Sequence, residues 1–376
     1  MLSYQLSNQN INSLKSLAQL AAKKQQIIEQ LDKEELDYIG RNVRISTIGA
    51  STRIENAVLT DAEIDWLDTV LSKEAKTTAY EENRESVLNK LSKDKERSID
   101  EVAGSRSMLN TINSEINTLF PLTEAALRGI HNELLQYYAP AERYKGSYKS
   151  SPNRVVRRNR ATGEETTVLE PSAPGPITNT AMRDLVSWYN EALVSNPWSV
   201  AVATEFVFRF LAIHPFQDGN GRVGRGLFLL ALMSCPDQSL RVVAPYLPID
   251  RYIEKQREDY YIVLRKVSGG KFNPDPSKYN YEPFLRFMMK VMTEAFEDID
   301  YYREKYAVLK SFPASTLDVL QAFKDRPEVR LQSGDIMQAT GLSRTPVRHH
   351  LDTLTEKGFI QKLGQKGPGV KYQLVF

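Results

Sequence analysis

The sequence is poor in several features that would assign it to a special class of protein. It contains a single cysteine, Cys235, which excludes an internal disulfide and suits a reducing compartment. The formal net charge is only +2 over 376 residues, so no strong overall field draws the chain to nucleic acid or membrane. The most apolar run, at residues 226–235, is about half as long as a bilayer crossing requires. The chain start shows no signal peptide. We therefore expect a cytoplasmic protein with no membrane partner.

Helical periodicity dominates the patterns that are present. Apolar residues at three-and-four spacing predict helices over residues 11–31, 61–73 and 123–138. The pattern changes further on, where short strands are expected over 154–158 and 166–169 around a hairpin turn. The fold class is therefore mainly α, and the length allows two or three domains with a well-buried core.

Two strongly apolar helices frame one polar loop. Residues 198–213 are apolar nearly all round, which is typical of a helix in the middle of a domain, and residues 222–233 predict a second buried helix. The loop between them reads HPFQDGNGR, residues 214–222. Because core helices hold both of its ends, we expect the geometry of this loop to be fixed.

The second half of this loop suits a bound polyphosphate. Gly219, Asn220 and Gly221 allow backbone N–H groups to converge into an anion nest. The nest lies at the start of a helix, whose dipole also favours anions. Arg222 and Arg225 are three residues apart, so both project from one side of the first helical turn, and their guanidinium groups match phosphate oxygens.

Two further side chains add a metal ligand and a base. Asp218 is a hard carboxylate among groups that attract anions, which is typical of a Mg²⁺ ligand beside phosphates. His214 has an ordinary pKa near neutrality and can take a proton from a hydroxyl. Together these groups predict in-line attack on a phosphoryl group. The alternative, a helix-capping loop with a glycine turn, accounts for the glycines alone.

The stretch HPFQDGNGRVGR, residues 214–225, resembles the signature of the Fic family, whose members transfer AMP from ATP to a Ser, Thr or Tyr hydroxyl of a protein. The resemblance implies ATP and Mg²⁺ as cofactors and a target protein as partner. It implies His214 as the base, Asp218 as the Mg²⁺ ligand and Phe216 as the anchor of the loop. The implied nucleotide-binding residues of the loop are His214, Gly219, Asn220, Gly221, Arg222, Val223, Gly224 and Arg225, with Arg222 on the β-phosphate and Arg225 on the γ-phosphate.

The resemblance extends beyond the signature. The hairpin over residues 154–169 resembles the flap of the family, which pairs with the target backbone as an added strand. Residues 257–270 resemble the segment that closes the adenine pocket, which implies that Tyr261 contacts the base. The implied fold is a Fic-type helical core with a β-hairpin flap, and we place it in residues 111–304.

Residues 51–56, STRIEN, allow two interpretations. Thr52 and Glu55 fit a capping box, in which a Thr N-cap and a carboxylate three residues later begin a helix. The stretch also resembles the inhibitory motif of Fic proteins, whose glutamate pairs with the second arginine of the signature, here Arg225, and leaves ATP misoriented. It lies in an N-terminal helical region, residues 1–110, as in the self-inhibited class. We expect an enzyme that Glu55 inhibits.

The C-terminal residues 305–376 predict a separate winged helix-turn-helix domain. Its expected elements are helices over 315–323, 333–340 and 344–358 and strands over 359–363 and 371–375. The recognition helix carries Arg344 and Arg348, and residues 315–376 hold nine Lys and Arg against six Asp and Glu. This modest basic face suits DNA phosphates or a protein partner. The sequence leaves both open, and it also leaves open whether the chain forms a homodimer.

Three functions follow from these patterns. The first is a self-inhibited protein adenylyltransferase. The second is removal of AMP from a modified protein, with Glu55 positioning a water. The third is a transcriptional regulator whose Fic core senses nucleotide without catalysis. A sensor needs the nest, Asp218 and the arginines but no base, so the intact His214 favours an enzyme.

Overall fold

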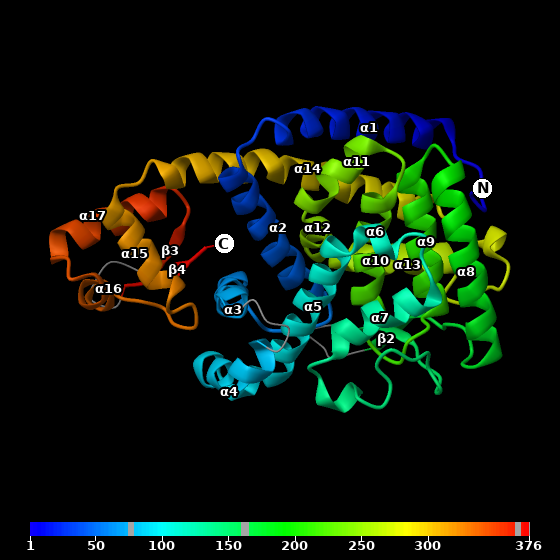
Figure 1. The fold of residues 1–376 in the computed structure, drawn as a ribbon, viewed down its shortest axis with the longest axis horizontal. Helices are drawn as coiled ribbons and strands as arrows, with labels where there is room; N and C mark the ends of the chain where they lie inside the picture. Colours follow the sequence, from blue (N-terminus) through cyan, green and yellow to red (C-terminus); the bar gives the residue numbers. More distant parts are fainter. Residues whose placement is uncertain (74–78, 159–164, 365–369, 376) are drawn as a thin grey trace. The chain divides into compact units, whose positions relative to one another are not determined.

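The computed structural model describes residues 1–73, 79–158, 165–364 and 370–375, and it confirms the mainly helical fold class (Figure 1). Internal contacts divide the chain into two compact units. The first consists of Met1–Ala57 and Asp100–Asp300, and the second of Val58–Ile99 and Tyr301–Phe376. The expected division at residues 110 and 304 stays a prediction. None of the helices in the described ranges is both long enough and apolar enough to cross a membrane.

The first unit is built from many helices and one hairpin. Its helices are α1 (Asn8–Ile28), α2 (Lys33–Ile54), α5 (Glu96–Ser114), α6 (Ile116–Leu119), α7 (Glu124–Leu135), α8 (Pro176–Ser195), α9 (Ser199–Ile213), α10 (Asn220–Ser234), α11 (Gln238–Val243), α12 (Ile249–Lys255) and α13 (Arg257–Ser268). Short 3₁₀ turns lie at η2 (Ala139–Ala141), η3 (Ala244–Tyr246) and η4 (Pro276–Lys278). Helix α5 begins in the second unit and continues in this one, and the long helix α14 (Glu282–Lys310) begins in this unit and ends in the second.

Helix α9 forms the centre of the first unit, as its apolar pattern predicts. Every residue of α9 except Arg209 is buried, and α8 and α10 pack along it (Figure 1). Each large apolar side chain buried in this way contributes about 1.5–3 kcal/mol. The loop that joins α9 to α10 is therefore held between two of the best-anchored helices of the unit.

The predicted hairpin is present as β1 (Val155–Arg158) and β2 (Glu165–Leu169). The two strands pair antiparallel, with Arg157 opposite Thr166. The expected turn over residues 159–163 lies outside the described residues. After β2, the backbone of Glu170 bonds to Gly270 and Phe272, which fixes the end of the hairpin beside the end of α13.

The capping-box interpretation of Thr52 and Glu55 is wrong. Helix α2 begins after its N-cap Asp32 and runs to Ile54, so Thr52 lies in the last turn of a helix. Its hydroxyl donates back to the carbonyl oxygen of Ile48 at 2.8 Å, and Glu55 is the C-cap. A capping box forms eight residues later. There the Thr60 backbone N–H donates to Glu63 Oε2 at 2.9 Å, and the Glu63 N–H donates to Thr60 Oγ1 at 3.3 Å.

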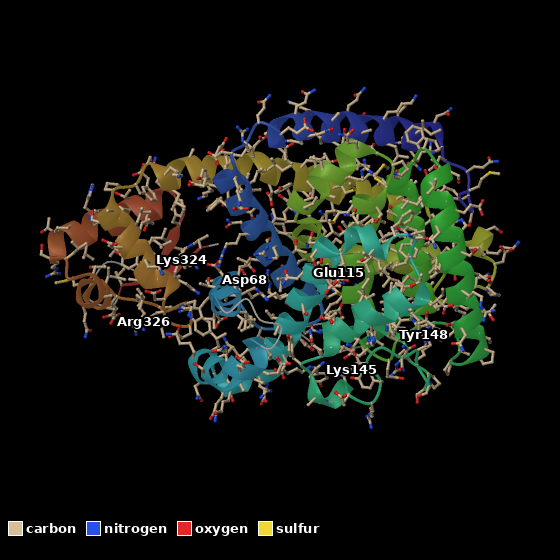
Figure 2. All side chains as sticks on the ribbon, in the orientation of Figure 1. Asp68, Glu115, Lys145, Tyr148, Lys324 and Arg326 are labelled. Atoms are coloured by element: carbon tan, nitrogen blue, oxygen red, sulfur yellow. The ribbon has the colours of Figure 1, made fainter. Side chains whose placement is uncertain are left out.

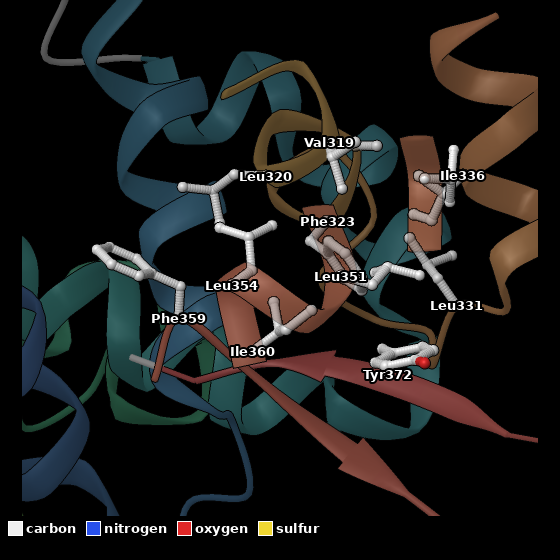
Figure 3. Close-up of a cluster of buried hydrophobic side chains, with 12 residues drawn as sticks. Val319, Leu320, Phe323, Leu331, Ile336, Leu351, Leu354, Phe359, Ile360 and Tyr372 are labelled. Carbon is white, nitrogen blue, oxygen red and sulfur yellow. The ribbon is translucent and has the colours of Figure 1, made fainter. Parts of the chain in front are cut away.

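The second unit contains the predicted winged helix together with a helical segment from the N-terminal half. Its elements are α3 (Asp61–Lys73), α4 (Ala79–Leu91), η1 (Lys93–Lys95), α15 (Ala314–Lys324), α16 (Ser333–Thr340), α17 (Arg344–Glu356), β3 (Ile360–Leu363) and β4 (Lys371–Leu374). Helix α15 contacts α3, and Lys90 forms an ion pair with Glu328 at 3.0 Å. Figure 3 shows the buried cluster that α15, α16, α17 and the β3–β4 hairpin share, with Phe323, Leu351 and Tyr372 among its members.

Candidate active site

A cleft of about 380 Å³ in the first unit brings the candidate residues together. The end of α2, the α9–α10 loop, the start of α10, the hairpin and α13 line it. Among its lining residues are Glu55, His214, Asp218, Arg222, Arg225 and Tyr261. Residues from four distant parts of the sequence thus face one space.

The α9–α10 loop is closed by its own side chains. His214 ends α9 in the left-handed conformation, at φ 53°. Phe216 is fully buried, as expected of an anchor. The Asn220 side chain accepts from the Phe216 N–H at 2.9 Å and donates to the Phe216 carbonyl oxygen at 2.7 Å. Gly219 adopts φ 78°, a conformation that favours glycine. The Asn220 side chain therefore shapes the loop, a role that the sequence analysis missed.

A strap formed by residues 148–153 holds the other side of the loop. Tyr148, which Figure 2 labels, pairs with Phe216 in an isolated β-bridge. Its hydroxyl donates to Glu124 on α7 at 3.0 Å. Lys149 is almost fully buried, and its Nζ donates to the Ile213 carbonyl oxygen at 3.1 Å. Asn153 Nδ2 donates to the Phe216 carbonyl oxygen at 2.8 Å. The strap satisfies backbone carbonyls that the end of α9 leaves open.

His131 supports the loop from α7. Its ring stacks on Phe216, with centroids 3.8 Å apart. The Gly146 N–H donates to His131 Nδ1 at 2.9 Å, so the ring proton resides on Nε2, which donates to the Asp218 carbonyl oxygen at 3.0 Å. Burial lowers the pKa of His131 to about 4, which keeps this arrangement neutral. The sequence analysis did not identify His131 as a loop support, because a buried histidine on a helix carries no signal of its partners.

His214 is a neutral imidazole in this environment. Burial lowers its pKa to about 4, and the positive charge of Lys149 acts in the same direction. The sequence predicted a pKa near neutrality for His214, and the buried environment lowers that pKa. Nδ1 lies 3.3 Å from the Leu211 carbonyl oxygen, an acceptor, so a proton on Nδ1 leaves Nε2 as the accepting nitrogen. At physiological pH His214 can therefore receive a proton without first losing one.

Arg222 presents unpaired donors. Its side chain is only 2% exposed, and its Nε and Nη1 have no hydrogen-bond partner among the residues that the structure describes. The carboxylates that lie nearby are Glu101, 3.8 Å from Nη1, and Asp218, 3.6 Å from Nη2. Leaving buried donors unsatisfied costs about 1–3 kcal/mol each. A bound anion in the cleft would supply the missing acceptors.

Arg225, by contrast, is fully engaged. Its Nη2 donates to Glu55 Oε1 at 3.0 Å and to the Ser51 carbonyl oxygen at 2.8 Å. Its Nε donates to Ser51 Oγ at 2.9 Å and lies 3.5 Å from Asp250 Oδ2. Glu55 fits only because Gly221 has no side chain, since a Cβ there would overlap Glu55 Oε1. The structure thus joins Glu55 to Arg225, and it adds Ser51 and Asp250, which the sequence analysis did not identify.

Asp218 lies at the mouth of the nest with its side chain 39% exposed. Its Oδ1 accepts from the Gly219 N–H at 2.6 Å. No group of three or more His, Cys, Asp or Glu side chains suited to a metal occurs in the part of the chain that the structure describes. Mg²⁺ at a phosphate site needs only one or two protein carboxylates, because phosphate oxygens and water complete its shell. Asp218 beside the nest fits that requirement.

The remaining candidates divide between cleft and core. Tyr261 lines the cleft, and the guanidinium carbon of Arg257 lies 5.8 Å from the centre of its ring. Arg257 also donates to Asn56 Oδ1 at 3.0 Å, which connects α13 to the residue after Glu55. Val223 and Gly224 point the other way, since Val223 is fully buried and Gly224 packs against Leu211. The structure therefore does not bring these two residues into the lining of the cleft.

The two central helices, the glycine-containing loop between them and the flanking β-hairpin are the elements expected of a Fic-type core. Residues 121–232 match the Fic/DOC family, and residues 315–364 match the IclR helix-turn-helix domain. The chain therefore carries a Fic/DOC family domain, followed by a winged helix. This confirms the family expected from residues 214–225.

Two curated relatives agree with this assignment. Over 271 residues, the chain is 25% identical to the protein adenylyltransferase Fic of Aedes aegypti, a match that covers 70% of this chain and 47% of that protein. Over 95 residues, it is 37% identical to a Fido domain-containing protein of Dictyostelium discoideum, covering 22% of this chain and 64% of the relative. The chain thus spans about half of the first relative and less than two thirds of the second.

Two crystal structures share the fold. A Fic family protein from Desulfovibrio desulfuricans superposes with a TM-score of 0.58 at 23% identity, over 100% of this chain and 98% of the other. A Fic domain-containing signaling protein from Bacteroides thetaiotaomicron gives a TM-score of 0.51 at 22% identity, over 77% of this chain and 97% of the other. At these identities the likeness concerns the fold alone.

Proposed function

We propose that the protein is an adenylyltransferase that moves AMP from ATP to a Ser, Thr or Tyr hydroxyl of a target protein. The observation that carries the proposal is that a neutral His214 lines the same cleft as a buried Arg222, whose Nε and Nη1 make no hydrogen bond to a described residue. One group can accept a proton, and the other has donors to offer an anion. The adenylyltransferase name of the Aedes aegypti relative supports the same chemistry.

The reaction follows from these positions. His214 Nε2 accepts the proton of the target hydroxyl, whose oxygen attacks the α-phosphorus of ATP. A bond forms between that oxygen and the α-phosphorus, and the bond from the α-phosphorus to the bridging oxygen breaks. Pyrophosphate leaves, and AMP stays on the protein. Arg222 and the N–H groups of the nest would hold the phosphates, because both act where negative charge collects.

Asp218 would hold Mg²⁺ against the phosphates in this scheme. The ion, when bound, supplies charge neutralisation for the leaving pyrophosphate. The protein's own part is to fix the Asp218 carboxylate through the Gly219 N–H and through the bond from His131 to the Asp218 carbonyl oxygen. Tyr261 would contact the adenine from α13.

Glu55 would inhibit this reaction. Its carboxylate occupies Arg225 inside the cleft, where the γ-phosphate of a productively bound ATP would pair. A triphosphate must displace Glu55 from Arg225 before it can adopt that position. The resting enzyme is therefore proposed to be self-inhibited.

The position of the label in ATP tests the activity. The Glu55→Gly variant should incorporate label from α-labelled ATP into itself or into lysate proteins, and none from γ-labelled ATP. His214→Ala in the same background should lower incorporation by about 10²-fold or more while nucleotide binding persists. Incorporation of the γ-label would mean phosphoryl transfer. Nucleotide binding with no incorporation of either label would favour the sensor.

One observation favours a second activity at the same site. The Glu55 side chain is 33% exposed and faces the cleft, so its carboxylate can orient a water as well as bind Arg225. That water would replace the target hydroxyl and release AMP from a modified protein. Addition of the unmodified chain to a protein labelled by Glu55→Gly should then release labelled AMP.

A further inference from the structure

We propose that Asp250 is a positioning residue that holds Arg225 ready for the γ-phosphate once Glu55 has left. The inference rests on the proposed function of the cleft. Asp250 belongs to neither the 214–225 loop nor the end of α2, and it lies at the start of α12.

The guanidinium of Arg225 is held at two different places. Nη2 binds Glu55 Oε1 at 3.0 Å, on the side that lines the cleft. Nε, on the same edge of the guanidinium as Nη2, lies 3.5 Å from Asp250 Oδ2. A phosphate that takes the place of Glu55 would bind at Nη2. Nε would keep its contact with Asp250 throughout the exchange.

The groups around Arg225 come from two different helices. Ser51 and Glu55 both belong to α2 and its C-cap, one helical turn apart, so a shift of the end of α2 affects both. Asp250 instead belongs to α12, and its side chain is 9% exposed between the buried Ile249 and Ile253. Of these three residues, Asp250 is the one that does not belong to the end of α2.

The charges support this division of roles. With Glu55 bound, Nη2 of Arg225 already has a carboxylate partner and is closed to a phosphate. With Glu55 gone, Asp250 is the carboxyl group that remains beside Arg225. Burial raises the pKa of Asp250, and the charge of Arg225 acts against that rise. A buried guanidinium with no carboxylate at all is strongly disfavoured. Asp250 thus keeps the arginine extended into the site instead of letting it turn away.

The test compares ATP with ADP, which differ only in the γ-phosphate. In the full chain carrying Glu55→Gly, calorimetry with Mg²⁺ should show that ATP binds more tightly than ADP. Adding Asp250→Asn should lower the ratio of ATP affinity to ADP affinity by about tenfold. It should also raise the KM for ATP by a larger factor than it lowers kcat. Asp250→Glu should restore part of the preference. In a chain carrying Glu55→Gly and Arg225→Ala, Asp250→Asn should change nothing further. An unchanged preference for ATP in Glu55→Gly, Asp250→Asn would overturn the proposal.

A single variant covers the case in which the double variant does not fold. Asp250→Asn with Glu55 intact keeps one carboxylate on Arg225, and we expect it to fold. Its labelling should fall below that of the unmodified chain, because Glu55 then becomes the remaining carboxylate on Arg225. A rise in labelling would instead make Asp250 part of the inhibition and would contradict the proposal. If Glu55→Gly binds nucleotide but transfers no AMP, the proposed function fails, and the ATP-to-ADP ratio still decides the role of Asp250.

Discussion

His214 shows how a single residue acquires its chemistry from neighbours that are remote in the sequence. Helix α9 delivers it in a left-handed conformation at the rim of the cleft, and the strap places Lys149 behind it. Burial and the lysine charge both disfavour the imidazolium. A proton acceptor that stays neutral well below physiological pH is the result.

A pH profile tests this environment. The pKa of His214 is lowered to about 4, so the active neutral form dominates at every pH above that value. In Glu55→Gly, kcat/KM for AMP transfer should therefore be flat through pH 6 and fall only towards pH 4. Lys149→Met removes one of the charges that lower the pKa, so the acid limb should move upward. An acid limb centred at the ordinary histidine pKa of about 6.5 would contradict this account.

At the scale of elements, the proposed inhibition involves the whole C-terminal end of α2. Glu55 contacts Arg225, Asn56 contacts Arg257, and Arg53 contacts Glu254. Three contacts within about one helical turn connect this helix end to α10, α12 and α13. Changes at Glu55 and at Glu254 should therefore act in the same direction.

The first prediction at this scale concerns Glu55 itself. Glu55→Gly removes the carboxylate from Arg225, so ATP can place its γ-phosphate there and AMP transfer should rise tenfold or more. Tenfold corresponds to about 1.4 kcal/mol, within the reach of one hydrogen bond between charged groups. Adding Arg225→Ala should cancel the gain. No increase in labelling by a variant whose thermal melt remains cooperative would show that Glu55 does not inhibit.

The second prediction at this scale concerns the ion pair between Arg53 and Glu254, which lies outside the cleft. Arg53 and Glu254 form two parallel bonds of 2.7 Å and 2.9 Å, and neither residue lines the cleft. Glu254→Gln should loosen the end of α2 and raise transfer by about two- to fivefold, in keeping with a partly exposed pair worth up to about 1 kcal/mol. The exchange of both charges, Arg53→Glu with Glu254→Arg, should restore inhibition. If the exchanged pair is as active as Glu254→Gln, the contact has no inhibitory role.

The sequence predicted the helices and the loop well because both depend on local patterns. Apolar periodicity identifies α9 and α10, and the residues of the 214–225 loop are contiguous. His131, Lys149 and Asp250 escaped notice because only the tertiary fold brings them to the loop. The capping box was misplaced because a Thr or Ser followed by Glu three residues later occurs twice within a few residues. Only the structure shows that α2 is still helical at Thr52 and that the box begins at Thr60.

At the scale of the whole molecule, the winged helix presents a basic surface of its own. On α17, Arg344, Arg348 and His349 are exposed, whereas Val347 and His350 face the core of the domain. Lys362 on β3 and Lys371 on β4 are exposed as well. Such a helix and hairpin are the parts of a winged helix that contact a DNA duplex.

Binding of the full chain to duplex DNA tests this surface. We expect affinity to fall steeply as salt rises, and Arg348→Ala to reduce the salt slope by about 0.9, the value for one lost phosphate contact. Glu356→Ala, at the other end of α17, serves as the matched control and should leave the slope unchanged. Absence of duplex binding at low salt would favour a protein partner for the same face.

The order of the chain through the two units has a consequence for the cleft. The polypeptide leaves the first unit after Ala57 and returns to it at Asp100. The Val58 N–H donates to Ser98 Oγ at 3.2 Å, so this hydrogen bond, called the clasp here, joins the outgoing and returning segments of the chain. Glu55, the partner of Arg225, lies just before this clasp, and Glu101, beside Arg222, lies just after it. Two of the three places where the chain passes between the units therefore lie next to the carboxylates that face Arg225 and Arg222, and the third lies within α14.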